Sequence, residues 1–419
     1  MPDSSLQETV REDAMRIISK RVRATNRVRL VVIANVGSAY DTIPGTHHFR
    51  EHLAFSDTAT RSATEIINLM SRYFQDYHAF TGKLNTLFLG EAVYSRFQQL
   101  ADVLFDIYLN PTFPEEEIKK ERGVILNEIA MLKQNDIQVA YDKLFRMLWK
   151  HNPIRVKGIG TPRNINKISR NHLVAAHRKW YVPSNTVIIC TGRINHNDLV
   201  AAANAAFPLN YKKVQYRHWH HEADMPPLRH EATLLREGRE QAVILAGVKI
   251  APLGEQTRDQ LGLLNAMLGG GSRDSLLWQE IREKRGLTYG VESGFESPHF
   301  SLGFCMYFIT EIMPQDIEET KKLIHLIACN TPLEKKHFQR QKEALLDSWL
   351  ISNETAHDWE DTIIQRAVYE GKPISFFQNY TKKRMRQLSR VTFNQICSLR
   401  EQLLTPERLA CVIVRPIDR

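Results

Sequence analysis

A short segment near the N-terminus combines residue types and a spacing that suit metal chemistry. It reads His48-Phe49-Arg50-Glu51-His52, with two histidines four positions apart. On a helix, positions i and i+4 lie on one face, so the two imidazoles can bind one metal ion. Glu51 lies next to His52 and can hydrogen-bond a water on that ion without being a ligand. The pattern therefore predicts hydrolytic zinc chemistry, although a surface helix with two unrelated histidines would show the same spacing.

Catalytic zinc is held by three protein ligands and keeps one open position, so a further ligand is needed. A long helix is expected over residues 114–134, because a proline and three acids open it and an apolar stripe follows. Glu121 and Glu128 lie two turns apart on this helix and share a face. Glu128 would be the third ligand, and Glu121 would lie behind it and orient a histidine. Taken alone, the two acids fit the solvated face of a long charged helix better.

Apolar and polar stretches predict an alternation of strands and helices along the chain, which is typical of an α+β protein. The expected strands are residues 29–36, 186–190 and 409–414. The expected helices are 46–55, 63–74, 93–108, 114–134 and 169–180. The first of these helices carries the two histidines, and the fourth carries the two acids.

Two sequence features recur at the same distance along the chain. The helix start at Ser169 resembles that at Ser389, and Asn110, before a proline and an acid-led helix, resembles Asn330. Both pairs are 220 positions apart, which favours a duplication over chance similarity between amphipathic helices. The His-x-x-Glu-His pattern occurs only in the first half. The expected domains are residues 1–207 with the metal site, a linker rich in Pro, His and charge at 208–240, and a metal-free half at 241–419.

Motifs over nearly the whole chain resemble those of the insulinase/pitrilysin family of zinc peptidases. In the first half the resemblance rests on GTHHFREHLAF at 45–55 and ERGVILNEI at 121–129, with 75 residues between His52 and Glu128. In the second half a glycine-rich turn at 269–272 is followed by REKRGLTY at 282–289. The similarity is specific because the ligand motif, the third ligand and the Arg/Tyr motif occur in the family's order.

This resemblance implies two homologous α/β sandwich halves, which together form half of a four-domain clamshell. It also implies one Zn²⁺ per chain and a peptide substrate held in a chamber. The residues that it assigns are the zinc ligands His48, His52 and Glu128, the general base Glu51, the supporting carboxylate Glu121, and the pair Arg282 and Tyr289, which would hold substrate and stabilise the tetrahedral intermediate. Without the resemblance, the last two would fit a helix end and a strand core.

The family's substrate-pairing edge strand reads Asn-Ala-aromatic-Thr, and His78-Ala79-Phe80-Thr81 matches it except at the first position. Backbone pairing with an extended peptide does not depend on that side chain, so His78, Ala79 and Phe80 are expected to bind substrate. Arg50 also departs from the usual apolar residue and is expected to place a positive charge near the site. Both departures bear on which peptides are preferred.

The resemblance implies a zinc-dependent endopeptidase that cleaves peptides, leaders or presequences. Since the chain supplies two of four clamshell domains, a homodimer or a heterodimer with a zinc-free homologous subunit is expected. The alternative is a non-catalytic or partner-dependent subunit of a heterodimeric processing peptidase. Such a subunit typically lacks a ligand, whereas this chain has all three, and the zinc stoichiometry of the purified chain would separate the two.

Composition and charge exclude several other classes of protein. The chain has 419 residues, 43% of them hydrophobic and 25% charged, which excludes disordered and fibrous proteins. No apolar run reaches the roughly 18–20 residues that span a bilayer. The polar N-terminus predicts no signal peptide and a cytoplasmic location. The net charge of +9 and the basic run at 382–390 favour a solvated helix face over nucleic-acid binding.

Two other groups of potential metal ligands carry less weight. The stretch RHWHHE at 217–222 is dense in histidine, but it lies in the expected linker without a partner at helical spacing. The five cysteines are scattered and form no Cys-x-x-Cys pair. They are therefore expected to be small buried residues in a reducing compartment.

Overall fold

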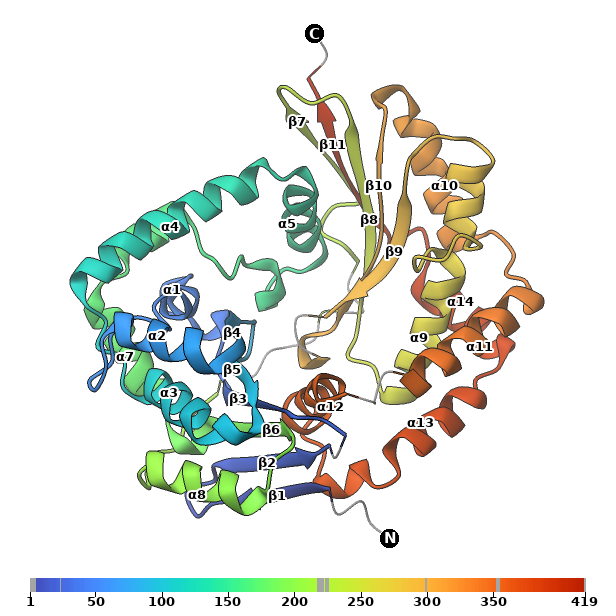
Figure 1. The fold of residues 1–419 in the computed structure, drawn as a ribbon. Helices are drawn as coiled ribbons and strands as arrows, with labels where there is room; N and C mark the ends of the chain where they lie inside the picture. The colour runs from blue at the N-terminus through green and yellow to red at the C-terminus, as the bar shows by residue number, and fades with distance from the viewer. Residues whose placement is uncertain are drawn as a thin grey trace. The chain divides into compact units, whose positions relative to one another are not determined.

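The computed structural model describes residues 5–22, 24–216, 222, 226–297, 300–351 and 355–417. Helices and two sheets form two compact units (Figure 1), which confirms the expected mixed α and β class. Unit 1 consists of Met1–Ala130, Lys157–His218 and Ser352–Tyr380, and unit 2 of Met131–Val156, Trp219–Ile351 and Thr381–Arg419. The units interleave along the sequence, so the expected boundaries at 207 and 241 stay a prediction about the homologous halves.

Unit 1 is built on a six-stranded sheet whose central strands are aliphatic and buried. The strand order is β1 (Leu6–Val10), β2 (Arg16–Arg21), β6 (Thr186–Gly192), β3 (Arg27–Ala34), β5 (Thr86–Val93) and β4 (Phe74–Thr81). β2 and β6 are parallel, and the other neighbours are antiparallel. This order leaves β4 at one edge of the sheet, where β5 is its only strand neighbour among the described residues.

Side chains alternate between the two faces of β3 and show which helices cover each face. Val28 and Leu30 belong to a hydrophobic core under α3 (Phe97–Leu109) and α8 (His196–Ala206), whereas Arg29 points to the opposite face. The other helices before residue 207 that concern the site are α1 (Thr46–His52), α2 (Ala63–Tyr73), α4 (Glu115–Gln134), α6 (Pro162–Lys167) and α7 (Arg170–Trp180).

Unit 2 repeats this topology. Its strand order is β7 (Glu231–Arg236), β11 (Ala410–Pro416), β8 (Ala242–Ile250), β10 (Phe304–Ile312) and β9 (Val291–Glu296). β7 and β11 are parallel and the remaining pairs antiparallel, as in the series β2, β6, β3, β5, β4 of unit 1. The predicted duplication is therefore confirmed at the level of topology. β7 lies within the residues that were expected to form a linker. Its apolar pattern is too weak to predict a strand, because every second residue of this edge strand is exposed.

Among the described residues after 241, five α-helices accompany the second sheet. They are α9 (Glu255–Leu268), α10 (Ile317–Cys329), α11 (Lys335–Ile351), α13 (Tyr380–Ser389) and α14 (Phe393–Leu403). Apolar residues of α9, α10 and α14 enclose the second hydrophobic core with β8 and β10. Among the helices of the described ranges, none is long and apolar enough to cross a membrane.

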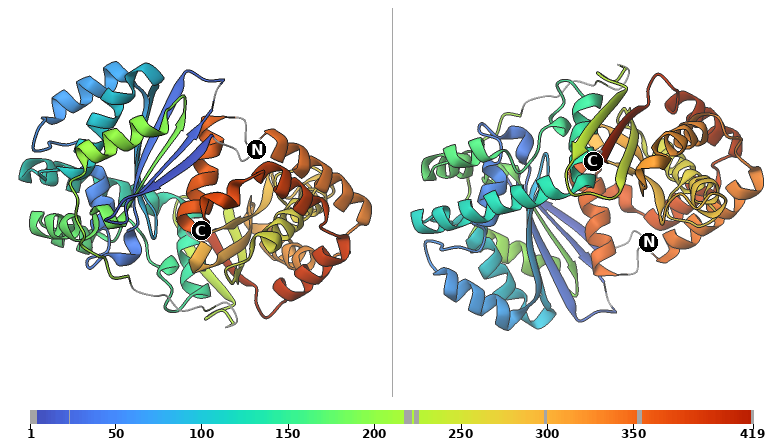
Figure 2. Two further views of the ribbon diagram at one scale, coloured as in Figure 1. Left: turned by 90° about the horizontal axis from the view of Figure 1, so that it is seen from below. Right: turned by 90° about the horizontal axis from the view of Figure 1, so that it is seen from above.

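One helix from each half of the sequence packs on the sheet of the other half. α5 (Asp136–Leu148) follows α4 but packs on β8 and β11, where Leu144 lies so close to Gly247 that a Cβ there would be 2.8 Å from its methyl group. α12 (Ala356–Ile363) follows α11 but packs on β6 and β3 of unit 1, as its orange ribbon in Figure 2 shows. The two helices start 220 positions apart, which is the offset found in the sequence.

A buried ion-pair network holds α12 on the sheet of unit 1. Arg29 on β3 donates from Nε and Nη2 to both carboxylate oxygens of Glu360 on α12, at 3.0 and 3.1 Å, and from Nη1 to Glu91 at 2.8 Å. The three residues are 8%, 3% and 4% exposed. Burial raises the pKa of Glu360, and the guanidinium of Arg29 opposes that rise. Removing either partner alone is therefore costly, because it leaves the other charge buried without its partner.

The Glu360→Ala variant is expected to lower the free energy of unfolding by about 3 kcal/mol, because it strips the guanidinium of Arg29 of its bidentate partner in a buried position. This loss of unfolding free energy is at the lower end of the range for broken buried ion pairs, because Glu91 still pairs with Arg29. Urea denaturation measures it. Asp361→Ala removes a carboxylate that is 63% exposed on the same helix and is the matched control. Equal midpoints for the two variants would contradict the role assigned to Glu360.

Candidate metal centre

The helix α1 begins at a glycine that the local packing requires. Gly45 precedes the helix with φ of 100°, and a Cβ there would lie 2.7 Å from Ile165 and 2.8 Å from the carbonyl oxygen of Ile159. Gly45 has no side chain to cap the helix, and Asp41 does this instead. Its carboxylate accepts hydrogen bonds from the backbone N–H groups of Gly45 and His47 at 2.8 and 3.0 Å. These contacts fix where the helix starts.

Three side chains that could bind a metal ion come together between α1 and α4. The Nε2 atoms of His52 and His48 lie 3.3 and 3.8 Å from the same carboxylate oxygen of Glu128. The three potential ligand atoms all lie within 4.8 Å of one another. His48 and His52 lie on one face of the helix with their ring centroids 4.7 Å apart. The structure thus brings together the three residues that the sequence suggested as ligands.

The donor set fits zinc in number, type and spacing. Ligand atoms at about 2.1 Å from a tetrahedral zinc ion lie about 3.4 Å from each other, close to the two distances in this group. Zinc binds the neutral form of imidazole. Burial, helped by the charge of His52, lowers the pKa of His48 to about 4, which favours that form. Two imidazoles and one carboxylate leave a fourth position open for water or substrate.

Glu121 lies behind this group, one step removed from the potential ligands. Its carboxylate oxygen is 3.2 Å from Nδ1 of His52, the ring nitrogen that faces away from Glu128. A carboxylate in this position fixes the tautomer and the orientation of a metal-binding histidine. The helix α4 therefore places Glu121 and Glu128 on one face, two turns apart, as the sequence suggested.

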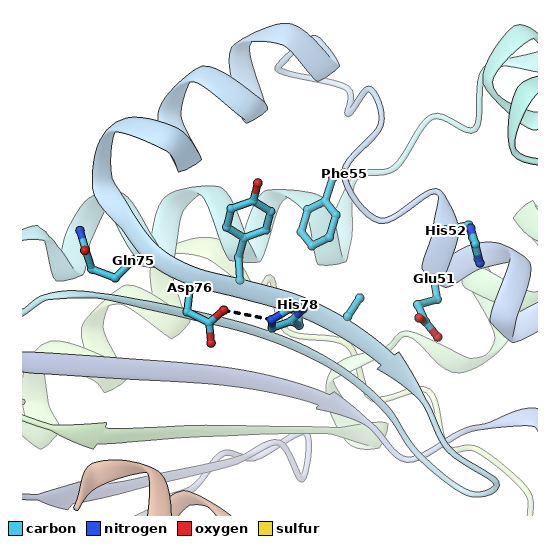
Figure 3. A pocket seen from close by; sticks show the side chains of 8 residues that line it. Glu51, His52, Phe55, Gln75, Asp76 and His78 are labelled. Carbon is cyan, nitrogen blue, oxygen red and sulfur yellow. Dashed lines mark ion pairs between the residues drawn. The ribbon is translucent and has the colours of Figure 1, made fainter. Parts of the chain in front are cut away.

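A pocket opens beside the three residues and contains Glu51. It is lined by Glu51, His52 and Phe55 together with Gln75–Ala79 of β4 (Figure 3). Burial raises the pKa of Glu51, while hydrogen bonds from Thr81 and the charge of His52 act against the rise. A carboxylate with a raised pKa is suited to take up and release a proton during turnover. The hydrogen bonds from Thr81 had no signal in the sequence, because they join residues 30 positions apart.

The pocket runs along the free edge of β4. The imidazole of His78 lies 3.0 Å from the carboxylate of Asp76, and the side chain of His78 is 70% exposed (Figure 3). Phe80 is also exposed, whereas Ala79 is partly buried against the core. The rings of Phe55 and Tyr77 pack edge to face at 5.5 Å above the strand. The strand thus offers unpaired backbone groups beside the potential metal ligands.

Arg50 does not place its charge in this pocket, contrary to the expectation from the sequence. The residue is 1% exposed, and its guanidinium contacts the rings of Phe88 and Tyr181, 4.3 Å from each centroid. It does not line the pocket, because Arg50 points from α1 towards the interior of unit 1. The departure from an apolar residue is accommodated by aromatic rings, so an effect of this charge on peptide preference does not follow.

Arg282 and Tyr289 lie together in unit 2, whereas the potential ligands belong to unit 1. Arg282 lies on a π-helical segment, Trp278–Glu283, and donates from Nε to the carbonyl oxygen of Tyr289 at 2.9 Å. Its guanidinium also stacks on Trp278 at 4.4 Å. The side chain of Tyr289 is free to contact a ligand, because the residue is 91% exposed.

Other groups of potential ligands in the chain differ from this one. His357, Glu360 and Asp361 also lie close together, but Glu360 is bound to Arg29 and serves the packing of α12. Of the histidine-dense stretch at 217–222, residues 217–221 lie outside the described residues. Its last residue, Glu222, accepts hydrogen bonds from three backbone N–H groups at residues 150–152. Within the described part of unit 2, no group of this kind occurs.

A duplicated fold with a His, His, Glu group in its first half defines the class of this protein. The model of the insulinase family (peptidase family M16) matches residues 16–161, and that of the M16 inactive domain matches residues 167–345. The chain belongs to the insulinase family of peptidases, M16. The resemblance seen in the sequence is thereby confirmed.

Relatives with similar sequences are named zinc proteases. An uncharacterized zinc protease of Rickettsia bellii is 29% identical over 310 residues, 71% of this chain and 72% of that protein. Those of Mycobacterium leprae and Bacillus subtilis are each 25% identical, over 95% and 97% of this chain and 89% and 97% of their own lengths.

Solved structures share the fold over the whole chain. A protein of Pseudomonas fluorescens described as a peptidase M16 inactive domain has a TM-score of 0.85 at 20% identity, and covers 99% of this chain and 98% of its own. A protease from Helicobacter pylori has a TM-score of 0.88 at 15% identity, with 99% and 100% covered. At these identities the likeness supports the fold alone.

Proposed function

We propose that this chain is a zinc-dependent endopeptidase that hydrolyses peptide bonds at the His48, His52 and Glu128 group. The observation that carries the proposal is the convergence of these three ligand atoms within 4.8 Å beside a pocket that contains Glu51. A structural zinc site would be closed by a fourth ligand, whereas three ligands beside a pocket are typical of catalysis. The relatives are named zinc proteases, which agrees with zinc as the metal, and we propose one ion per chain.

The residues around the pocket divide the chemistry between them. His48, His52 and Glu128 would hold the zinc ion, which would supply a Lewis acid for the scissile carbonyl and for the attacking water near neutral pH. Glu51 accepts the proton of the attacking water and delivers it to the leaving amine. Glu121 keeps the ring of His52 in the orientation that binding requires.

The free edge of β4 supports an extended peptide as substrate. A peptide that adds to this edge forms backbone hydrogen bonds along His78, Ala79 and Phe80, and its scissile bond lies near Glu51. We further propose that Arg282 and Tyr289 donate hydrogen bonds to the oxyanion, each worth about 3 kcal/mol. Such a site favours unstructured peptides, including leaders and presequences, over folded proteins.

Assembly forms part of the proposal, since two units correspond to half of the family's four-domain clamshell. A homodimer or a heterodimer with a zinc-free homologous subunit would complete the chamber. A partner-dependent or non-catalytic subunit is the second candidate, because the match to a model described as an inactive domain covers residues 167–345. One zinc ion per purified chain supports the enzyme, and a chain without zinc at neutral pH supports the second candidate.

A digest of a peptide library tests the proposal directly. The purified chain is expected to cleave peptides, to lose this activity with a chelator and to regain it with added zinc, as read by mass spectrometry of the products. The cleavage sites also define which residues the pocket prefers. Cleavage that persists with the chelator, or none in any zinc-loaded sample, would contradict a zinc endopeptidase that acts on its own.

A further inference from the structure

The helix that carries Glu51 also carries a cation that is buried without an acidic partner. Arg50 is 1% exposed, and in the described part of the chain no carboxylate lies within ion-pair distance of its guanidinium. An isolated charge in a protein interior is costly and is kept only where other groups compensate it. The contacts of Arg50 therefore indicate what it does.

The first compensation comes from the end of a neighbouring helix. Nη2 of Arg50 donates to the carbonyl oxygens of Tyr108 and Ile107, at 3.2 and 3.4 Å, in the last turn of α3. The last four carbonyl groups of a helix lack partners within it and carry partial negative charge, which a buried cation can balance. Nε2 of His177 on α7 lies 3.1 Å from the next carbonyl oxygen, of Leu109.

The second compensation comes from two aromatic rings, which also restrict the side chain in space. The guanidinium carbon lies 4.3 Å from the ring centroids of Phe88 on β5 and of Tyr181 after α7, two rings that meet edge to face at 6.3 Å. Cations over aromatic faces gain up to about 2 kcal/mol when desolvated. Since the guanidinium contacts both rings and its Nη2 faces the end of α3, Arg50 connects α1 to β5, to α3 and to the residue after α7.

The helix α1 needs such a connection because it is short. It has seven residues, and isolated helices of this length are not stable. Its start is held by Asp41, which bonds the backbone N–H groups of Gly45 and His47 and the ring of His47, and Arg50 adds a contact in its last turn. Its buried residues are Thr46, His47, Phe49 and Arg50, whereas His48, Glu51 and His52 are only partly buried.

We propose that Arg50 is a positioning residue, which ties α1 to the C-terminus of α3 and so fixes the direction in which His48, Glu51 and His52 point. This inference rests on the proposed function only in that these three residues bind or serve zinc. Misplacement of reacting groups by about 1 Å can lower turnover about a hundredfold. A rotation of α1 would move both imidazoles relative to Glu128, which lies on a different helix.

The Arg50→Met variant tests the inference, because methionine fills much of the same apolar space but offers no hydrogen bond to the two carbonyl groups. Zinc affinity, measured by competition with a chelator, is expected to fall about 10- to 100-fold, as for other residues that orient ligands. The visible spectrum of the Co²⁺-loaded protein should change with the ligand geometry. Arg50→Lys keeps the charge and one donor and is expected to recover part of the affinity.

Two comparisons separate positioning from simple stability. Arg72→Met removes an exposed arginine that lies over Tyr73 on α2, and should leave zinc affinity and melting temperature unchanged. A variant Arg50→Met with wild-type zinc affinity and Co²⁺ spectrum, and only an altered melting temperature, would overturn the inference. If that variant does not fold, a several-fold loss of affinity in Arg50→Lys supports the inference and wild-type affinity overturns it. A wild-type chain that binds no zinc would instead contradict the proposed function.

Discussion

Peptide cleavage by the Glu51→Gln variant is expected to fall by about 10²- to 10⁴-fold, while zinc stays bound. Glutamine has nearly the same shape as glutamate but cannot accept the proton of the attacking water. Glu51 lines the pocket and does not belong to the group of converging ligand atoms, so its replacement leaves the donors of zinc in place. Turnover of a peptide found in the library digest and the zinc content of the same sample give the two measurements.

The matched control for this change is Glu116→Gln, which alters an exposed carboxylate on α4 and should cleave like the wild type. Unchanged turnover in Glu51→Gln would rule out Glu51 as the base. Loss of zinc together with turnover would indicate that Glu51 is a ligand or supports one, which differs from the role proposed for it.

The Glu128→Ala variant is expected to lose zinc affinity by about a hundredfold or more. Binding free energies of about 10–16 kcal/mol for four-ligand zinc sites correspond to about 3 kcal/mol per ligand, and 1.4 kcal/mol is a factor of ten. Glu128 supplies the one ligand from outside α1, so zinc held by the two histidines alone would have two open positions, one more than a catalytic site keeps. Chelator competition measures the affinity, and excess zinc should restore only part of the cleavage.

Glu116→Ala on the same helix is the control and should bind zinc normally. Since Glu128 is the more exposed of the two acids that face α1, its loss should leave the fold intact, which circular dichroism checks. Wild-type zinc affinity in Glu128→Ala would show that the group formed with His48 and His52 is not the metal site.

The parts of the site that the sequence predicts are those with a local pattern. The spacing of His48 and His52 is a property of one helix, and the two acids of α4 share a face by the same rule. The pairing of α1 with Glu128 came from the resemblance to the family, since residues from two helices approach each other only through the fold. The apolar, β-branched run at 29–36 likewise predicted a strand, which the structure has as β3.

Contacts between distant segments had no such signal. Arg50 departs from an apolar residue, and only its packing against Phe88 and Tyr181 shows that its charge is turned away from the pocket. The same holds for the hydrogen bonds of Thr81 and for α12. Nothing in the eight residues of α12 indicates which sheet the helix packs on. Tertiary contacts decide such features, because several burial partners would satisfy the same amphipathic pattern.

The exchange of α5 and α12 has a consequence for how this chain can be divided and how it arose. A fragment that ends at residue 207 would contain α5 without its sheet, and would leave Arg29 and Glu91 on a face of β3 and β5 that lacks its helix. Neither half is thus a self-sufficient folding unit. Two separate copies of a single ancestral half would exchange this helix between chains, as in a domain-swapped dimer. Fusion of those copies turns an association between subunits into a single polypeptide that cannot be bisected.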